Sequence, residues 1–377
     1  MILSEEQAMI RDMARDFAAN RLAPDSVAWE QAAAVPKQIF DEMGSLGLMG
    51  MTVPEKFGGA ETDFVSYALA LMEIAGGDGA VSTVMSVNNS PCCAALLKDG
   101  TEEQKQKYLV PLAKGEMIGA FCLTEPHAGS DASALKTKAV RDGDDFIING
   151  TKQFITSGKI GGVALVFAVT DQDGGKKGIS CFIVPTDAEG YRVASIESKL
   201  GQKASDTCQI AFDDVRVPAS NMLGAEGAGY RIALANLETG RIGIGAQSVG
   251  MASAALAHAI EYAKERNSFD QPIISHQAVG FRLADMATKV EVARQMVLHA
   301  ASLKDAGLPC LTEASMAKLF ASEMAEEVCS GAIQTLGGNG FIADYPVEKI
   351  YRDVRVCQIY EGTSDIQKMV IARNLAA

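Results

Sequence analysis

Four short segments of the chain combine glycines, hydroxyls and carboxylates in patterns that could bind a flat ligand and move a proton. In one of them Glu361 directly precedes Gly362. A glutamate becomes a useful general base when its surroundings raise its pKa from about 4.3 toward neutrality. Taken alone, a glutamate before a glycine is more often an ordinary surface residue. The four segments are residues 122–131, 151–158, 334–341 and 358–365.

Each of the other three segments also has an ordinary interpretation. Glycine, serine and aspartate favour turns for local reasons, so residues 122–131 alone indicate a turn. If the second segment forms a strand, Phe154 and Thr156 share a face that suits stacking and one hydrogen bond to a flat ligand, although an isolated Phe154 is more often core. Gly337 and Gly338 permit close approach of a ligand to the backbone, and they would equally suit the end of a helix.

The composition indicates a folded protein that is too large for one typical core. With 377 residues, the chain is expected to form two or three domains or one enlarged domain. Hydrophobic residues make up 48% and charged residues 21%, which is enough apolar surface to bury a core. The net charge of −13 argues against a nucleic-acid groove, because a phosphate backbone selects for clustered lysine and arginine.

The cysteines and histidines indicate neither disulfides nor a metal site. The eight cysteines include no C-x-x-C pair, and a chain of this length does not need disulfides to fold. The four histidines show no spacing typical of metal ligands. The N-terminus lacks a basic segment followed by an apolar run, so we expect no secretory signal, a cytoplasmic location and reduced thiols.

The residue pattern changes twice along the chain, from helical to β and back to helical. Ser4 and Gln7 form a predicted capping box at the start of the first helix. Short runs rich in valine, isoleucine, phenylalanine and threonine follow, and they predict strands at residues 146–148, 163–170 and 179–184. A long helix is then predicted by an apolar seam with alternating spacings of four and three, at Val279, Leu283, Met286, Val290, Ala293 and Val297.

Two stretches without charged residues raise the question of a membrane span. Residues 79–97 contain two asparagines and a proline, and residues 242–260 are rich in glycine, alanine, serine and glutamine. Neither has the apolar density of a spanning helix of about 20 residues, so we expect both to be buried in a helical protein. Residues 224–229 are rich in glycine but do not give G-x-G-x-x-G, and the absence of a surrounding βαβ pattern excludes a Rossmann site.

Taken together and in order, the four segments resemble the acyl-CoA dehydrogenase family, and the resemblance extends over essentially the whole chain. Its most specific stretches are residues 122–134, 334–344 and 349–353. The resemblance implies an α+β fold with an N-terminal α-helical domain at 1–115, a middle β domain at 116–225 and a C-terminal four-helix bundle domain at 226–377. Residues 85–90 and 238–244 look like those of short-chain, butyryl-CoA dehydrogenase-like members.

The resemblance also implies FAD as cofactor and a role for each matched residue. Glu361 matches the catalytic base, which removes a proton next to the thioester carbonyl of an acyl-CoA. Some relatives place the base at the position of Gly240, where glycine cannot act, so Glu361 has no competitor there. The matched substrate contacts are Ser130, Glu238, Arg241 and Gly362. The matched FAD contacts are Leu123, Thr124, Gly129, Ser130, Phe154, Thr156, Arg266, Phe269, Gln277, Gln334, Gly337, Gly338, Thr363 and Asp365.

Phe154 departs from the family pattern, because most members carry a tryptophan there. Phenylalanine lacks the indole donor, so its contact with the flavin would be stacking alone. The implied adenine contacts, from Arg266 to Gly338, come partly from another subunit, which predicts an oligomer, typically a homotetramer. The implied electron acceptor is an electron-transferring flavoprotein.

Other functions remain open at this point. A short branched-chain acyl-CoA dehydrogenase is a close alternative, as is an oxygen-using acyl-CoA oxidase or monooxygenase of the same fold. A nucleic-acid-binding flavoprotein would need a basic tail, and residues 372–377 contain a single arginine. The leading prediction is therefore α,β-dehydrogenation of short-chain acyl-CoA to trans-2-enoyl-CoA, with no nucleic acid and no membrane span.

Overall fold

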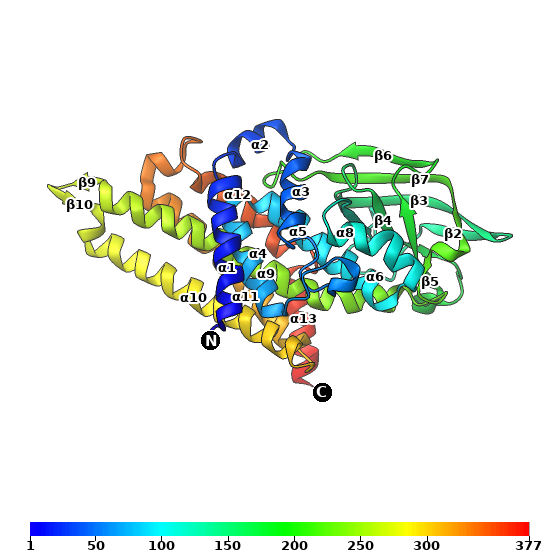
Figure 1. Cartoon of the computed structure of the whole chain (residues 1–377). Helices are drawn as coiled ribbons and strands as arrows, with labels where there is room; N and C mark the ends of the chain where they lie inside the picture. The colour runs from blue at the N-terminus through cyan, green and yellow to red at the C-terminus, as the bar shows by residue number, and fades with distance from the viewer. Residues whose placement is uncertain (377) are drawn as a thin grey trace.

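Helices from both ends of the chain pack together, and the strands from its middle form a sheet beside them (Figure 1). The structure is a computed structural model that describes residues 1–376. The predicted capping box is confirmed, since Ser4 Oγ accepts from the backbone N–H of Gln7 while the Gln7 side chain accepts from that of Ser4. The helices before the sheet are α1 (Glu5–Phe17), α2 (Ser26–Ala32), α3 (Lys37–Ser45), α4 (Phe64–Gly77), α5 (Gly79–Val87), α6 (Ala94–Asp99), α7 (Glu102–Gln104) and α8 (Val110–Ala113).

The middle of the chain forms a sheet of eight strands. Their spatial order is β6-β7-β3-β2-β4-β5-β8, and β1 pairs in parallel with β4. The predicted runs at 146–148, 163–170 and 179–184 lie in β3, β4 and β5 respectively. The strands are β1 (Gly119–Cys122), β2 (Lys138–Asp142), β3 (Asp145–Thr156), β4 (Val163–Val169), β5 (Ile179–Pro185), β6 (Tyr191–Ile196), β7 (Thr207–Pro218) and β8 (Met222–Leu223).

Three long helices dominate the rest of the chain. They are α9 (Gly229–Glu265), α10 (Gln277–Asp305) and α11 (Leu311–Leu336), which pack against one another. The short strands β9 (Asn267–Ser268) and β10 (Gln271–Pro272) form a hairpin between α9 and α10, and α12 (Val347–Val354) and α13 (Ser364–Leu375) follow α11. The predicted seam of α10 is confirmed, because five of its six residues are buried: Leu283, Met286, Val290, Ala293 and Val297.

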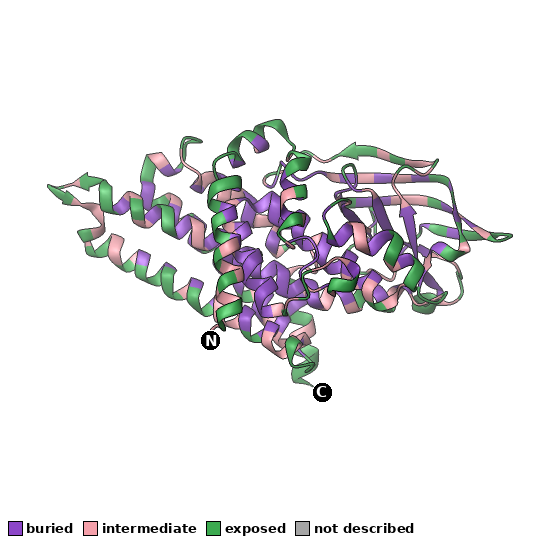
Figure 2. Ribbon diagram, viewed as in Figure 1, coloured by how far each residue is buried: buried purple, intermediate pink, exposed green. Residues whose placement is uncertain are grey.

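The strands β4 and β5 are buried on both faces, and so are the inner faces of the helices, whereas β2 and β6 are largely exposed (Figure 2). Along β4, Val163, Leu165 and Phe167 pack with residues of α6 and α8 on one face, while Ala164 and Val166 belong to a second cluster on the other. Because successive side chains of a strand point to opposite faces, β4 contributes to two separate apolar layers.

The small residues of α9 explain how it comes so close to its neighbours. A Cβ at Gly250 would lie 2.0 Å from the carbonyl oxygen of Met72, so only glycine lets α9 approach α4 at this point. This close packing accounts for the uncharged stretch at 242–260, most of which is buried inside the helical layer. Within residues 1–376, no helix is long and apolar enough to cross a membrane.

Candidate active site

Glu361 lies in a tight turn that enters α13. Glu361 and Gly362 both have positive φ, at 52° and 92°, so the backbone turns sharply between the end of α12 and α13. The side chain of Gln367 donates to the carbonyl oxygens of Gly362 at 2.9 Å and Glu361 at 3.3 Å. The hydroxyl of Thr363 caps α13 by accepting from the N–H of Ile366. These bonds fix the direction in which Glu361 leaves the backbone.

The carboxylate of Glu361 points into the protein. The residue as a whole keeps some exposure, but its Oε2 is buried and has no hydrogen-bond partner among the described residues. Burial raises the pKa of Glu361 to about 7, against the opposing effect of Lys318 and Arg241. A base whose pKa lies near neutrality is present as carboxylate in useful amounts and still has a strong enough affinity for a proton.

Two cations accompany this carboxylate, and together with Gly240 and Gly362 they form what we call the base pocket. Lys318 on α11 is fully buried and donates to the carbonyl oxygen of Gly362 at 2.7 Å. Burial lowers its pKa to about 8. Arg241 on α9 is also buried, with its Nε unpartnered in the described part of the chain, and burial lowers its pKa as well.

Gly240 faces the Glu361 carboxylate directly. A Cβ at position 240 would lie 1.9 Å from Oε2 of Glu361, which is far inside van der Waals contact. Positions 240 and 361, which the sequence resemblance gives as the two alternative places for the base, therefore converge on the same small volume. A side chain at position 240 would therefore require the carboxylate of Glu361 to move.

A series of hydrogen bonds holds Tyr360, the residue before Glu361. Tyr360 Oη donates to Gln247 at 3.2 Å, and Gln247 donates to Thr83 Oγ1 at 3.0 Å. Thr83 donates to Gln202 at 2.6 Å, and Gln202 donates to the backbone carbonyl of Asp353 at 3.1 Å. The turn at Glu361 is thus linked to α9, α5, the loop between β6 and β7, and α12.

The sequence analysis predicted neither this series of hydrogen bonds nor Lys318. The network joins residues that are distant in sequence, so local spacing carries no trace of it. Lys318 did leave a signal, since it falls on the buried face of α11 among Ala314, Ala317 and Ala321, where a charged residue is unexpected. A lysine on an apolar seam would have singled out this position.

The predicted flavin contacts near the sheet come from two neighbouring segments, and we call them the sheet set. Leu123 and Thr124 directly follow β1, and they are tied to β3 because Lys152 donates to the carbonyl of Leu123 at 3.0 Å while the N–H of Gln153 donates to that of Thr124 at 2.8 Å. Lys152 is itself held by a buried ion pair with Glu125 at 2.8 Å. The complete sheet set is Leu123, Thr124, Gly129, Ser130, Phe154 and Thr156.

Phe154 projects outward from the end of β3. Its φ is 59°, at an irregularity in the pairing of β3 with β7 between Lys152 and Ile155. The side chain is 63% exposed and Thr156 is partly exposed, whereas Ile155 between them is buried. Phe154 is thus not a core residue, and its ring is available for stacking.

The remaining predicted FAD contacts lie mainly at the far end of the helices, and we call them the bundle-end set. They lie around the end of α9, the β9–β10 hairpin and the end of α11. This hairpin and the sheet stand at opposite ends of the folded molecule (Figure 1). One chain alone does not bring the sheet set and the bundle-end set together. The bundle-end set is Arg266, Phe269, Gln277, Gln334, Gly337 and Gly338.

The residues of both sets fit a flat, phosphate-bearing cofactor such as FAD. A Cβ added at Gly129, Gly337 or Gly338 would have no atom within 4 Å, so a ligand can reach the backbone there. Phe154 and Phe269 are 63% and 91% exposed, and they offer two ring faces for stacking. FAD, when bound, would be held by these glycines and rings.

Three other predicted residues lie near the base pocket or at its border. Glu238 on α9 is partly buried and accepts from the thiol of Cys310 at 3.6 Å. Thr363 is the N-cap of α13, and Asp365 is exposed in its first turn. The structure thus brings Arg241 and Gly362 to Glu361, while Asp365 faces outward.

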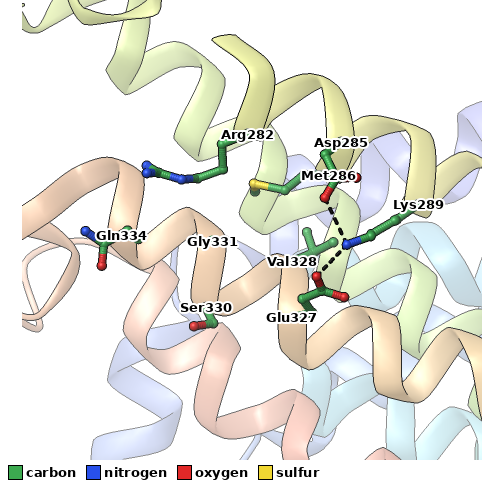
Figure 3. Close-up of a pocket in the computed structure, with 9 residues that line it drawn as sticks. All are labelled: Arg282, Asp285, Met286, Lys289, Glu327, Val328, Ser330, Gly331 and Gln334. Atoms are coloured by element: carbon green, nitrogen blue, oxygen red, sulfur yellow. Dashed lines mark hydrogen bonds and ion pairs between the residues drawn. The ribbon is translucent and has the colours of Figure 1, made fainter. Parts of the chain in front are cut away.

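A separate cavity of about 300 Å³ opens between α10 and α11 (Figure 3). Lys289 crosses it, with its Nζ 2.9 Å from Asp285 and in a second ion pair with Glu327. Gln334 is the one predicted site residue in its lining, and Glu361 does not contribute. The lining residues are Arg282, Asp285, Met286, Lys289, Glu327, Val328, Ser330, Gly331 and Gln334.

Comparison with known proteins defines the class. Three family models match the chain: "Acyl-CoA dehydrogenase, N-terminal domain" at residues 4–116, "Acyl-CoA dehydrogenase, middle domain" at 120–215, and "Acyl-CoA dehydrogenase, C-terminal domain" at 227–376. An acyl-CoA dehydrogenase of Bacillus subtilis is 48% identical over 375 residues, covering 100% of this chain and 99% of that protein. The chain belongs to the acyl-CoA dehydrogenase family, and it is accordingly an oxidoreductase that uses FAD.

Two further relatives have names that specify a substrate or a partner. The structure of butyryl-CoA dehydrogenase from Megasphaera elsdenii has a TM-score of 0.98 and 41% identity, and it covers 100% of both chains. The caffeyl-CoA reductase-Etf complex subunit CarC of Acetobacterium woodii is 44% identical over 373 residues, 99% of this chain and 98% of that one. The family and α+β fold predicted from the sequence are confirmed.

Proposed function

We propose that this protein removes two hydrogens from the α and β carbons of short-chain acyl-CoA thioesters, giving trans-2-enoyl-CoA, with Glu361 as the base. The observation that carries the proposal is the buried, unpartnered carboxylate of Glu361, whose pKa burial raises to about 7. The preference for a short acyl group is supported by the similarity of the whole polypeptide to a butyryl-CoA dehydrogenase.

In the proposed reaction, Glu361 takes the proton from the carbon next to the thioester carbonyl. A carboxylate that is shielded from water is a stronger base than one in bulk solvent, because its charged form is less well solvated. The fixed turn at Gly362 keeps the base in one orientation, which raises the rate by holding it near its target. FAD, when bound, supplies the acceptor for the hydride that leaves the β carbon.

We also propose that FAD is shared between chains. The sheet set and the bundle-end set lie at opposite ends of one chain, so a second chain must bring its bundle-end set to the sheet set of the first. This supports an oligomer, and the family resemblance favours a homotetramer. An electron-transferring flavoprotein is the proposed electron acceptor, supported by the similarity to a subunit of an Etf complex.

The test compares Glu361 with Glu238, a second carboxylate that also acts electrostatically on Arg241. Purified protein should be yellow and should bleach when butyryl-CoA is added without oxygen. Glu361→Gln should retain FAD and slow bleaching by at least about 1,000-fold, because an amide cannot accept the proton. Glu238→Gln is the matched control and should lose less than about tenfold, since it is not the base.

Three outcomes would contradict the proposal. Wild-type rates in Glu361→Gln would remove Glu361 as base. Faster bleaching with branched than with straight four-carbon acyl-CoA would make the enzyme a branched-chain dehydrogenase, and oxygen consumption in step with turnover would make it an oxidase.

A further inference from the structure

We propose that Lys318 is a positioning residue for Glu361, whose buried ammonium group holds the turn at Gly362 and keeps the neighbouring carboxylate ionised at neutral pH. This inference depends on the proposed role of Glu361 as the base. It assigns to α11 a function in the reaction that is separate from its packing role in the helical layer.

The contacts of Lys318 are unusual for a buried lysine. Its side chain has no exposed surface, and its hydrogen bond to the carbonyl of Gly362 at 2.7 Å joins it to the residue directly after the base. In the described part of the chain it takes part in no ion pair within 4.0 Å, whereas the other fully buried lysine, Lys152, is paired with Glu125. A charge without a close counter-ion is costly to bury, so a purely structural hydrogen bond is a poor explanation for a lysine here.

The electrostatic balance around Glu361 shows what this charge does. Burial raises the pKa of Glu361, and Lys318 is the largest influence that acts in the opposite direction, followed by Arg241. Without Lys318 the carboxyl would bind its proton more tightly and would be ionised only at higher pH. The charged or titratable groups around the pair are Arg241 and Glu238 on α9, Tyr67 on α4, Glu323 on α11, and Cys357 before the turn.

Lysine and arginine differ in a way that matters at this position. Burial lowers the pKa of Lys318 to about 8, so its charge can vary within the pH range of the experiment, while Arg241 stays charged.

Gln367 provides a natural comparison, because it donates to the same Gly362 carbonyl at 2.9 Å but carries no charge. Removing Gln367 therefore perturbs the turn alone, and removing Lys318 perturbs the turn and the electrostatics.

The experiment measures kcat/KM for butyryl-CoA against pH in holoenzyme variants, from about pH 5.5 to about pH 9. In the wild type, activity should rise with pH through about 7, because the ionised carboxylate is the active form. Lys318→Met should move this rise upward by about one pH unit or more, with activity recovering at high pH. Lys318→Arg should restore the wild-type position, and Gln367→Met should lower activity at every pH without moving the rise.

The pH profiles of these variants can overturn the proposed role of Lys318. An unmoved rise in Lys318→Met, or an equal shift in Gln367→Met, would overturn the proposal. Lys318→Gln repeats the test if the methionine variant is unstable, and failure of both neutral variants to fold while Lys318→Arg folds would make the role structural. The proposed function fails separately, since Glu361→Gln would then react like the wild type whatever Lys318 does.

Discussion

The base pocket and the predicted FAD contacts are built in opposite ways. Around Glu361 one chain brings together Gly240 from α9, Lys318 from α11 and the turn at Gly362, and Oε2 of Glu361 is buried among its residues. The sheet set and the bundle-end set instead leave aromatic rings and glycine backbone open, at opposite ends of the chain. A single chain thus brings together the residues that, as we propose, move a proton, while the proposed flavin contacts depend on the cofactor and on a second chain.

The largest effect expected from a substitution that keeps Glu361 tests how closed the base pocket is. Gly240→Ala would place a Cβ 1.9 Å from Glu361 Oε2, so the carboxylate must move. A displacement of this size should lower kcat by about 100-fold, because the base no longer faces its target. Steady-state kinetics on the FAD-loaded variant would measure it.

Gly76→Ala is the matched control for this substitution. A Cβ at Gly76 has its nearest neighbour at 3.6 Å, so this helical glycine accepts alanine without a clash. The control should behave like the wild type in kcat and thermal stability. A kcat for Gly240→Ala within about twofold of the control would show that the carboxylate is not confined.

An intermediate effect tests the openness of the FAD contacts. Gly129→Ala and Gly338→Ala should leave the thermal midpoint unchanged, because a Cβ at either position meets no atom within 4 Å. Each should nevertheless weaken FAD binding by about tenfold, since the methyl group occupies space that the cofactor needs. Fluorescence titration of apoprotein with FAD would measure the change, with Gly76→Ala again as control. Unaltered affinity in both variants would place the cofactor elsewhere.

The smallest expected effect concerns Phe154. Because its side chain is 63% exposed, Phe154→Trp should hardly change stability. The larger ring adds stacking surface and an indole donor, so we expect a change in kcat within about threefold together with a measurable shift in the flavin reduction potential. Potentiometric titration of both proteins would detect it, and identical potentials would mean that the ring does not contact the flavin.

Local pattern was sufficient to predict much of the fold. The seam of α10, the capping box at Ser4 and the runs that became β4 and β5 were all predicted, because each depends on residues that are close in sequence. The match of motifs to a family then predicted Glu361 as the base, but no local feature showed that this carboxylate is desolvated.

Long-range contacts account for what the sequence did not predict. Lys318 lies 44 residues before the carbonyl that it contacts, and Tyr360 lies 113 residues from Gln247. Hydrogen bonds over such separations depend on how whole helices pack, and periodicity gives no information about partners of this kind. The placement of the β9–β10 hairpin and the sheet at opposite ends of the folded molecule likewise follows from the assembled helices and not from either motif.

The glycine at 240 also constrains how such an enzyme could change over evolutionary time. A mutant that gained a glutamate at 240 while keeping Glu361 would force two negative groups into the volume of one, and a mutant that first lost Glu361 would have no base at all. Neither single step passes through a well-functioning enzyme. Relocation of the base from the turn before α13 to α9 would therefore require changes at both positions.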